Sequence, residues 1–226
     1  MSAAGPDGVE SSACPDGEEE GWCRTCDSRL PRWTLRVCTC CRRYIDPKWD
    51  ACPITHENTA LPGVLPVGGY DDGWGKLVRA LKYDGARAIG PALGRVLALR
   101  VRELGPLDLV VPIPTTASKK RARGFGHAEV IAEHTARELG VACRADALTF
   151  TRAVDDQTRL SPDERVKNLD GALVASAENL ADSRILIIDD VMTTGATVNE
   201  AARALRTAGA VYLYGAVVCL NMGSHP

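Results

Sequence analysis

The sequence predicts an α/β fold in which a mostly parallel sheet is flanked by helices and preceded by a small cysteine-rich module. Two observations support this prediction. Short apolar, β-branched runs alternate with longer segments whose apolar residues recur at helical spacing, and strands that alternate with helices build parallel sheets through right-handed crossovers. In addition, most of the nine cysteines precede residue 60. A two-part chain is therefore expected.

Length and composition narrow the functional classes. The chain has 226 residues, enough for one medium domain and a small appendage. Its formal net charge of −2 and pI of about 6.1 exclude a global basic field of the kind that drives nonspecific nucleic-acid binding. No apolar run is long enough to span a bilayer, and residues 1–20 are acidic and polar, unlike a secretory signal. We expect a cytoplasmic protein without membrane contact.

Three regions follow from the composition. Residues 1–20 are too poor in apolar side chains to fold, and we expect them to be a disordered acidic tail. Residues 21–60 are rich in cysteine, which indicates a small module stabilised by a bound metal ion. Residues 61–226 contain the alternating strands and helices, so they are predicted to form the main domain.

The expected elements of the main domain follow from hydrophobic period and from glycine and proline stops. Residues 61–66 are a linker or a first strand. In order, the rest are helices over 72–83 and 91–104, a strand over 108–113, a helix over 128–139, a strand over 147–151, a polar segment over 152–168, a strand over 185–188, a helix over 198–208 and a strand over 211–220.

Two C-x-x-C pairs indicate a metal site in the cysteine-rich module. Cys23 and Cys26 form the first pair, and Cys38 and Cys41 form the second. Two such pairs separated by a short loop are typical of a structural, tetrahedral Zn²⁺ site with four thiolate ligands. Reduced thiols or a redox pair are the alternatives, and Cys40 could replace Cys41 as a ligand. Cys52 and His56 have no partner pair nearby and are expected to be bystanders, so one metal ion is predicted.

Paired carboxylates and a threonine-rich loop follow the strand over 185–188. Asp189 and Asp190 come at the end of a buried strand, where open α/β sheets bind ligands. The next loop opens into a helix, whose N-terminal N–H groups and dipole favour a phosphate, and Gly195 permits close approach of the backbone. A tight Thr- and Gly-rich connection is the alternative, but paired acids at a strand end are energetically costly unless they have a function. We predict a sugar 5-phosphate site, with Asp190 as a candidate general base. The predicted residues are Asp189, Asp190, Thr193, Thr194, Gly195, Ala196 and Thr197.

A basic loop after the strand over 108–113 predicts a diphosphate site. The strand ends in a stiff Pro-Ile-Pro turn, and residues 115–123 carry hydroxyls and cations. Such groups can offset the charge that develops on a leaving diphosphate. A solvated basic turn and a nucleic-acid patch remain open as alternatives. The predicted residues are Pro114, Thr115, Lys119, Lys120 and Arg123.

The polar segment over 152–168 is predicted to be a lid. Long loops in compact domains are often functional, and this one carries Arg and Lys side chains that could close over a bound diphosphate and exclude water. A mobile solvated loop is the alternative.

Several of these motifs together resemble the ComF family in order and spacing. They are the cysteine pairs, Leu81-Lys82-Tyr83, the Val111–Pro114 and Arg123–Phe125 turns, and the segment over 184–197, which also resembles the phosphoribosyltransferase binding motif. The resemblance implies a zinc ribbon on a phosphoribosyltransferase-type sheet, phosphoribosyl pyrophosphate with Mg²⁺ as ligand, and a link to DNA uptake. It names no acceptor. The family's usual Asn and Gln are replaced here by Gly126 and His127.

The sequence is therefore compatible with two alternative functions. The first is a phosphoribosyltransferase, with Asp189 and Asp190 on the ribose and the basic loop on the diphosphate. The second is a non-catalytic accessory protein of natural transformation, whose zinc ribbon and 119–123 cluster contact single-stranded DNA or a helicase.

Overall fold

The structure is a computed structural model that describes residues 36–39, 44–45, 60–61, 63–83, 86–154, 162–176, 180 and 182–221. Several predictions fall outside these residues. They concern the acidic tail over 1–20, the cysteines at 23, 26, 40, 41 and 52, His56, and part of the lid, residues 155–161.

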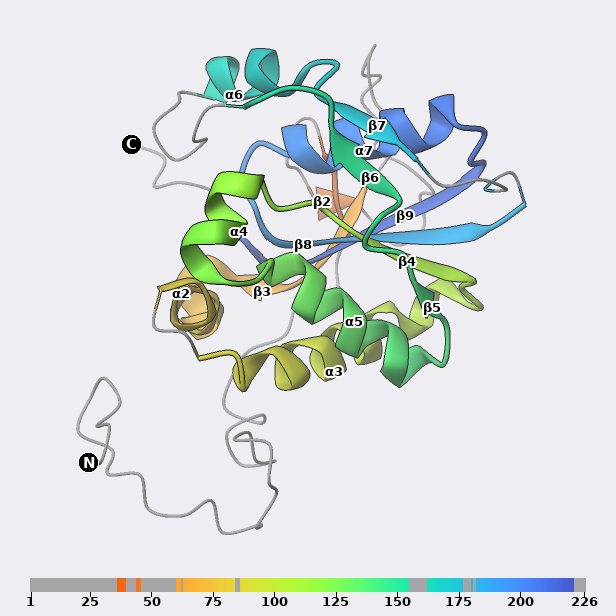
Figure 1. Ribbon diagram of the computed structural model, residues 1–226. Helices are drawn as coiled ribbons and strands as arrows, with labels where there is room; N and C mark the ends of the chain where they lie inside the picture. Colours follow the sequence, from red (N-terminus) through yellow and green to blue (C-terminus); the bar gives the residue numbers. More distant parts are fainter. Residues whose placement is uncertain are drawn as a thin grey trace, which may run out of the picture.

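The main sheet has seven strands in the order β2-β1-β3-β9-β8-β4-β5 (Figure 1). Neighbours from β3 to β5 pair in parallel, whereas β1 pairs antiparallel with β2 and β3. The predicted mostly parallel α/β sheet is therefore confirmed. The strands are β1 Arg36–Val37, β2 Tyr44–Ile45, β3 Val64–Gly69, β4 Leu109–Pro112, β5 Ala142–Cys143, β8 Arg184–Met192 and β9 Tyr212–Leu220.

Helices cover both faces of this sheet. In Figure 1, α2, α3 and α5 lie on one side and α7 lies on the other. The helical segments are η1 Tyr70–Trp74 (a π-helical turn), α2 Gly75–Tyr83, α3 Ile89–Val101, η2 Arg102–Leu104 (a 3₁₀ turn), α4 Ala117–Arg123, α5 His127–Leu139, α6 Pro162–Leu169 and α7 Ala196–Thr207. None of the helices in these described ranges is long and apolar enough to cross a membrane.

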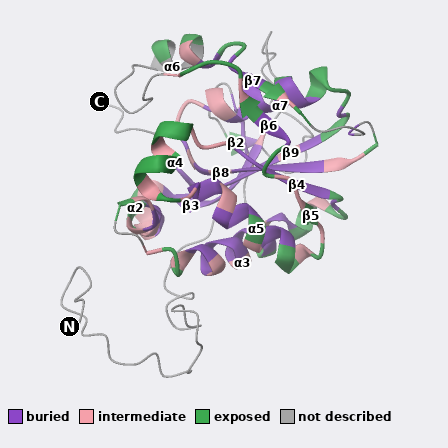
Figure 2. Cartoon of the chain, viewed as in Figure 1, coloured by how far each residue is buried: buried purple, intermediate pink, exposed green. Residues whose placement is uncertain are grey.

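The continuous apolar run in β8 is explained by cover on both faces. Ile185 and Ile187 point into the core beneath α7, whereas Leu186 and Ile188 point into the core beneath α3 and α5. All four side chains are fully buried, as the central strands in Figure 2 show. Alternate side chains of a strand face opposite sides, so a strand with two covers must be apolar at every position.

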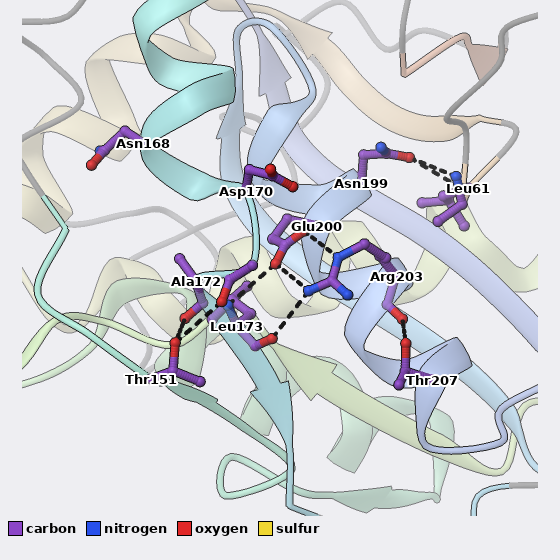
Figure 3. A network of polar contacts seen from close by, with 12 residues as sticks. Leu61, Thr151, Asn168, Asp170, Ala172, Leu173, Asn199, Glu200, Arg203 and Thr207 are labelled. Carbon is purple, nitrogen blue, oxygen red and sulfur yellow. Dashed lines mark hydrogen bonds and ion pairs between the residues drawn. The ribbon is translucent and has the colours of Figure 1, made fainter.

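A small second sheet sits over α7. Strands β6 (Leu148–Phe150) and β7 (Leu173–Ala175) pair antiparallel. The buried carboxylate of Glu200 on α7 accepts hydrogen bonds from Leu173 N, at 3.3 Å, and from Arg203 Nε and Nη2, both at 2.6 Å (Figure 3). This network connects the small sheet to the helix that begins at the threonine-rich loop.

The structure corrects the sequence prediction at several short elements. Residues 115–123 were expected to be a loop, but α4 occupies residues 117–123, where Ala, Lys and Arg are good helix formers. Helix α6 and strand β7 were not predicted either, nor was β5. The longer elements are confirmed: α3 with η2 matches the helix over 91–104, and α5 ends at Gly140 as expected.

Candidate functional site

A pocket of about 750 Å³ opens at the carboxyl ends of β4 and β8. Strand β4 ends at Pro112, which pairs with Ile188, while β8 continues to Met192 beside β9. Asp189 and Asp190 therefore stand just beyond the end of β4, inside a strand that is longer than predicted. This is the edge at which open α/β sheets bind ligands.

The pocket brings together most of the twelve residues predicted to bind the sugar phosphate and the diphosphate. Ten of them line it: Pro114, Thr115, Lys119, Arg123, Asp189, Asp190, Thr193, Thr194, Gly195 and Thr197. Two do not. Ala196 begins α7 and donates its N–H to Thr194 Oγ1 at 3.3 Å, and Lys120 Nζ binds Glu129 Oε2 at 2.7 Å. The paired acids, the threonine loop and the basic turn thus face one volume, although Lys120 points elsewhere.

The threonine loop has the geometry of an anion site. Gly195 is the N-terminal cap of α7 and adopts φ 81°, a left-handed conformation that favours glycine. It supplies no side-chain hydrogen bond to the first turn of the helix. Thr194 Oγ1 accepts the N–H of Ala196, but the remaining N–H groups at a helix N-terminus are natural partners for a phosphate. Thr193, Thr194 and Thr197 add hydroxyls around the same wall of the pocket.

Asp190 is held by groups that the sequence prediction did not include. Its Oδ1 accepts a hydrogen bond from Lys82 Nζ at 2.7 Å, and its Oδ2 lies 3.9 Å from His127 Nδ1. Burial alone would lower the pKa of Lys82, but the attraction of Asp190 and their hydrogen bond outweigh it, and the pKa lies above its ordinary value. The ammonium of Lys82 is therefore charged at neutral pH.

His127 lies against the acids as a neutral imidazole. Burial lowers the pKa of His127 to about 4, an effect that the attraction of Asp190 only partly offsets. The imidazole packs edge-on against the ring of Phe125, with 5.3 Å between the ring centroids. Within the described part of the chain, the buried Nε2 of His127 has no hydrogen-bond partner. Both His127 and Lys82 line the pocket. The Leu-Lys-Tyr motif marks Lys82 in the sequence. Its hydrogen bond to Asp190, 108 positions away, could not be predicted from the motif.

Asp189 is the most perturbed carboxyl of the site. Burial, followed by repulsion from Asp190, raises the pKa of Asp189 to about 7, and Lys82 opposes this only in part. Its Oδ1 accepts the backbone N–H of Asp190 at 2.8 Å. A carboxyl that titrates near neutral pH in a pocket suits proton transfer.

Replacement of Asp189 by Asn is expected to stabilise the free protein in a pH-dependent way. The pKa of about 7 in the folded state exceeds the unfolded value of about 3.9. The native protein therefore loses stability as pH rises from about 4 through 7, whereas Asn, which keeps an acceptor oxygen, has no proton to release. The gain should approach at most about 4 kcal/mol above pH 7. Thermal unfolding at pH 5.5 and pH 8 checks this; an equal gain at both pH values would contradict it.

The described residues bear differently on the predicted Zn²⁺ and Mg²⁺ sites. Of the four predicted zinc ligands only Cys38 lies among the described residues, where it is fully buried, so the zinc site stays a prediction. For Mg²⁺, the carboxylates of Asp189 and Asp190 are oxygen donors of the kind that this ion prefers. Because Lys82 already binds Asp190, the site fits an ion that arrives with a diphosphate better than one held by protein alone.

Comparison with known proteins defines the class of this chain. The family described as "Phosphoribosyl transferase domain" matches residues 126–225, which include the threonine loop. "DNA utilization protein YhgH" of Salmonella typhi is 30% identical over 84% of this chain and 92% of its own length. "Competence protein F" of Haemophilus influenzae is 26% identical over 83% of this chain and 80% of its own length. The fold is thus that of a phosphoribosyltransferase-type domain.

The chain belongs to the ComF family, as the motifs predicted. "Competence protein ComFC" of Bacillus subtilis is also similar, at 25% identity over 84% of this chain and 80% of its own. Among solved structures, glutamine phosphoribosylpyrophosphate amidotransferase of B. subtilis matches 58% of this chain and 26% of its own, with a TM-score of 0.41 and 21% identity.

Proposed function

We propose that this protein binds phosphoribosyl pyrophosphate together with Mg²⁺ in the pocket between β4 and β8. One observation carries the proposal: the paired acids, the threonine loop and the basic turn, distant in sequence, line one volume of about 750 Å³. In this arrangement Asp189 and Asp190 accept hydrogen bonds from the ribose hydroxyls. Residues 193–197 hold the 5-phosphate at the start of α7. Cytoplasmic location is part of the same proposal.

The pocket is arranged to help the diphosphate leave. Lys119 and Arg123, in helix α4 shortly after Pro114, line the same pocket as the acids. Cations and polar groups there would stabilise the charge that develops as the bond between the anomeric carbon and the diphosphate breaks. An acceptor nucleophile would form the new bond at the same carbon, and Mg²⁺ would neutralise part of the diphosphate charge. Asp189, a carboxyl with a pKa near 7, could take the acceptor's proton in place of Asp190, which the sequence suggests for this role but which Lys82 binds.

Isothermal titration calorimetry tests the proposal. Phosphoribosyl pyrophosphate should bind in the presence of Mg²⁺, and both ribose 5-phosphate and inorganic pyrophosphate should compete with it. Absence of binding heat with and without Mg²⁺, at temperatures that rule out a zero enthalpy, would remove it.

The two neighbouring lysines of α4 should differ in their effect on diphosphate binding. Lys119→Ala is expected to weaken binding of Mg²⁺-pyrophosphate about 10-fold, the loss of one hydrogen bond to a charged group. Lys120→Ala should leave affinity unchanged, because Lys120 binds Glu129 and does not line the pocket. Calorimetric titration of both variants checks this, and equal losses would show that the basic turn acts only through its overall charge.

A DNA-binding accessory role is the second candidate, favoured by the outer face of α4. Arg121 is exposed, does not line the pocket and lies in a helix that carries four cations and no acid in seven residues. Relatives that are named for competence or DNA utilization make this role worth testing. An oligonucleotide should bind at low salt and lose affinity steeply as salt rises, and Arg121→Glu should weaken it. No binding at low salt would exclude the role.

A further inference from the structure

The backbone of Thr39 lies directly against the threonine loop. At Gly195 an added Cβ would overlap the carbonyl oxygen of Thr39 and would stand 3.2 Å from its Cα. Gly195 lines the pocket, whereas Thr39 does not. Thr39 therefore supports the loop without lining the pocket in which a ligand would bind.

Hydrogen bonds hold Thr39 in this position. Its side chain is buried, and Oγ1 donates to the carbonyl oxygen of Leu61 at 2.6 Å. The amide N–H groups of Ala60 and Leu61 donate to Asn199 Oδ1 at 2.9 and 3.4 Å, and Figure 3 shows the link between Leu61 and Asn199. Asn199 lies in the first turn of α7, where its N–H donates to the carbonyl oxygen of Gly195 at 2.9 Å.

These contacts form a closed ring of four residues: Gly195 touches Thr39, Thr39 binds Leu61, Leu61 binds Asn199, and Asn199 binds Gly195. The ring joins a segment near residue 39 to a loop more than 150 positions away. A phosphate site binds more tightly when its N–H groups are already fixed, because binding then costs less ordering of the loop. Contacts of the ring that lie outside the pocket would hold these N–H groups in place before a ligand binds.

We propose that Thr39 is a positioning residue for the loop that binds the 5-phosphate, so that the segment carrying Cys38 takes part in sugar-phosphate recognition without touching the ligand. This inference rests on the proposed function of the pocket. It extends the site to a part of the chain that the sequence assigned to a separate module. By linkage, a bound sugar phosphate should in turn stabilise the segment around Thr39.

The test compares two ligands that occupy different ends of the pocket. Thr39→Val keeps the shape of the side chain but removes the hydroxyl that binds Leu61. On the full chain, calorimetry should show affinity for ribose 5-phosphate reduced about 10-fold, within the usual range of coupling between sites, and affinity for Mg²⁺-pyrophosphate unchanged. Thr39→Ser, which retains the hydroxyl, should restore binding of ribose 5-phosphate.

A second variant opens the ring elsewhere. Asn199→Ala should cause the same selective loss, whereas Thr207→Ala, which also removes a hydrogen bond to the backbone but at the far end of α7, should not. Three results would overturn the positioning role. They are native affinity in Thr39→Val, an equal loss of affinity for both ligands, and unfolding of both ring variants at 25 °C. If the native protein binds neither ligand, the proposed function itself fails; if it binds both and only the variants show no selectivity, this inference alone fails.

Discussion

Replacement of Asp190 by Asn is expected to reduce affinity for phosphoribosyl pyrophosphate about 100-fold. The carboxylate is nearly buried at 8% exposure, and Lys82 and His127 flank its two oxygens. A hydrogen bond to a charged group contributes about 1.5–3 kcal/mol, so loss of the negative charge toward two ribose hydroxyls corresponds to about 3 kcal/mol. The substitution also leaves the ammonium of Lys82 without its counter-ion, which is costly at a half-buried position.

Asp146→Asn serves as the matched control for this variant. Asp146 also pairs with a cation, Arg144, at 2.9 Å, but it is exposed and does not line the pocket. Exposed ion pairs contribute little, so binding should stay native. Calorimetric titration of both variants with phosphoribosyl pyrophosphate checks this prediction. If Asp190→Asn binds the ligand as tightly as native protein does, the paired acids do not hold the ribose.

Replacement of Gly195 by Ala is expected to abolish binding of ribose 5-phosphate and to destabilise the protein by more than about 2 kcal/mol. A residue with a Cβ in the left-handed region costs about 1–2 kcal/mol. At Gly195 the new methyl group would also overlap the carbonyl oxygen of Thr39, so either the loop or the segment at residue 39 must move. Movement of the loop displaces the N–H groups that would hold the phosphate.

Gly140→Ala separates the two causes. Gly140 has a similar φ of 71°, but its added Cβ would meet no atom within 4 Å. This variant should show only the backbone strain and should bind ribose 5-phosphate normally. Thermal unfolding and calorimetry on the pair provide the measurement. Equal destabilisation with intact binding in Gly195→Ala would show that the contact with Thr39 has no role.

Much of the core and the pocket wall could be predicted because their signals are local. The run over 185–188 is apolar at every position, which indicates a strand covered on both faces, and acids followed by a Thr- and Gly-rich loop mark its functional end. Helix α5 repeats its apolar residues at helical spacing and stops at Gly140. Pattern and structure agree at these elements because period, cap and burial all follow from neighbouring residues.

The remaining features depend on contacts that the local sequence does not encode. Lys82 is one of three cations in α2, with Lys76 and Arg79, and only the fold brings it to Asp190. Short elements such as β5 and β7 lack enough residues to show a period, and they form because a partner strand is already in place. The charge run over 115–123 predicts a loop, but α4 forms there because Ala, Lys and Arg have high helix propensity.

The cysteine-rich segment shows the same limit most clearly. Its composition indicated a separate module, yet its described strands β1 and β2 continue the main sheet through β3. The contact of Thr39 with Gly195 likewise follows from tertiary packing. Sequence patterns identified the groups that would bind a ligand, whereas the groups that hold them in place became visible only in the fold.

The most direct test of the central claim is a crystal structure of the protein with phosphoribosyl pyrophosphate and Mg²⁺. The account predicts the 5-phosphate within hydrogen-bond distance of the N–H and hydroxyl groups of residues 193–197, and the ribose hydroxyls on Asp189 and Asp190. A ligand bound outside the pocket, or a 5-phosphate placed away from the threonine loop while the loop keeps its present shape, would contradict it.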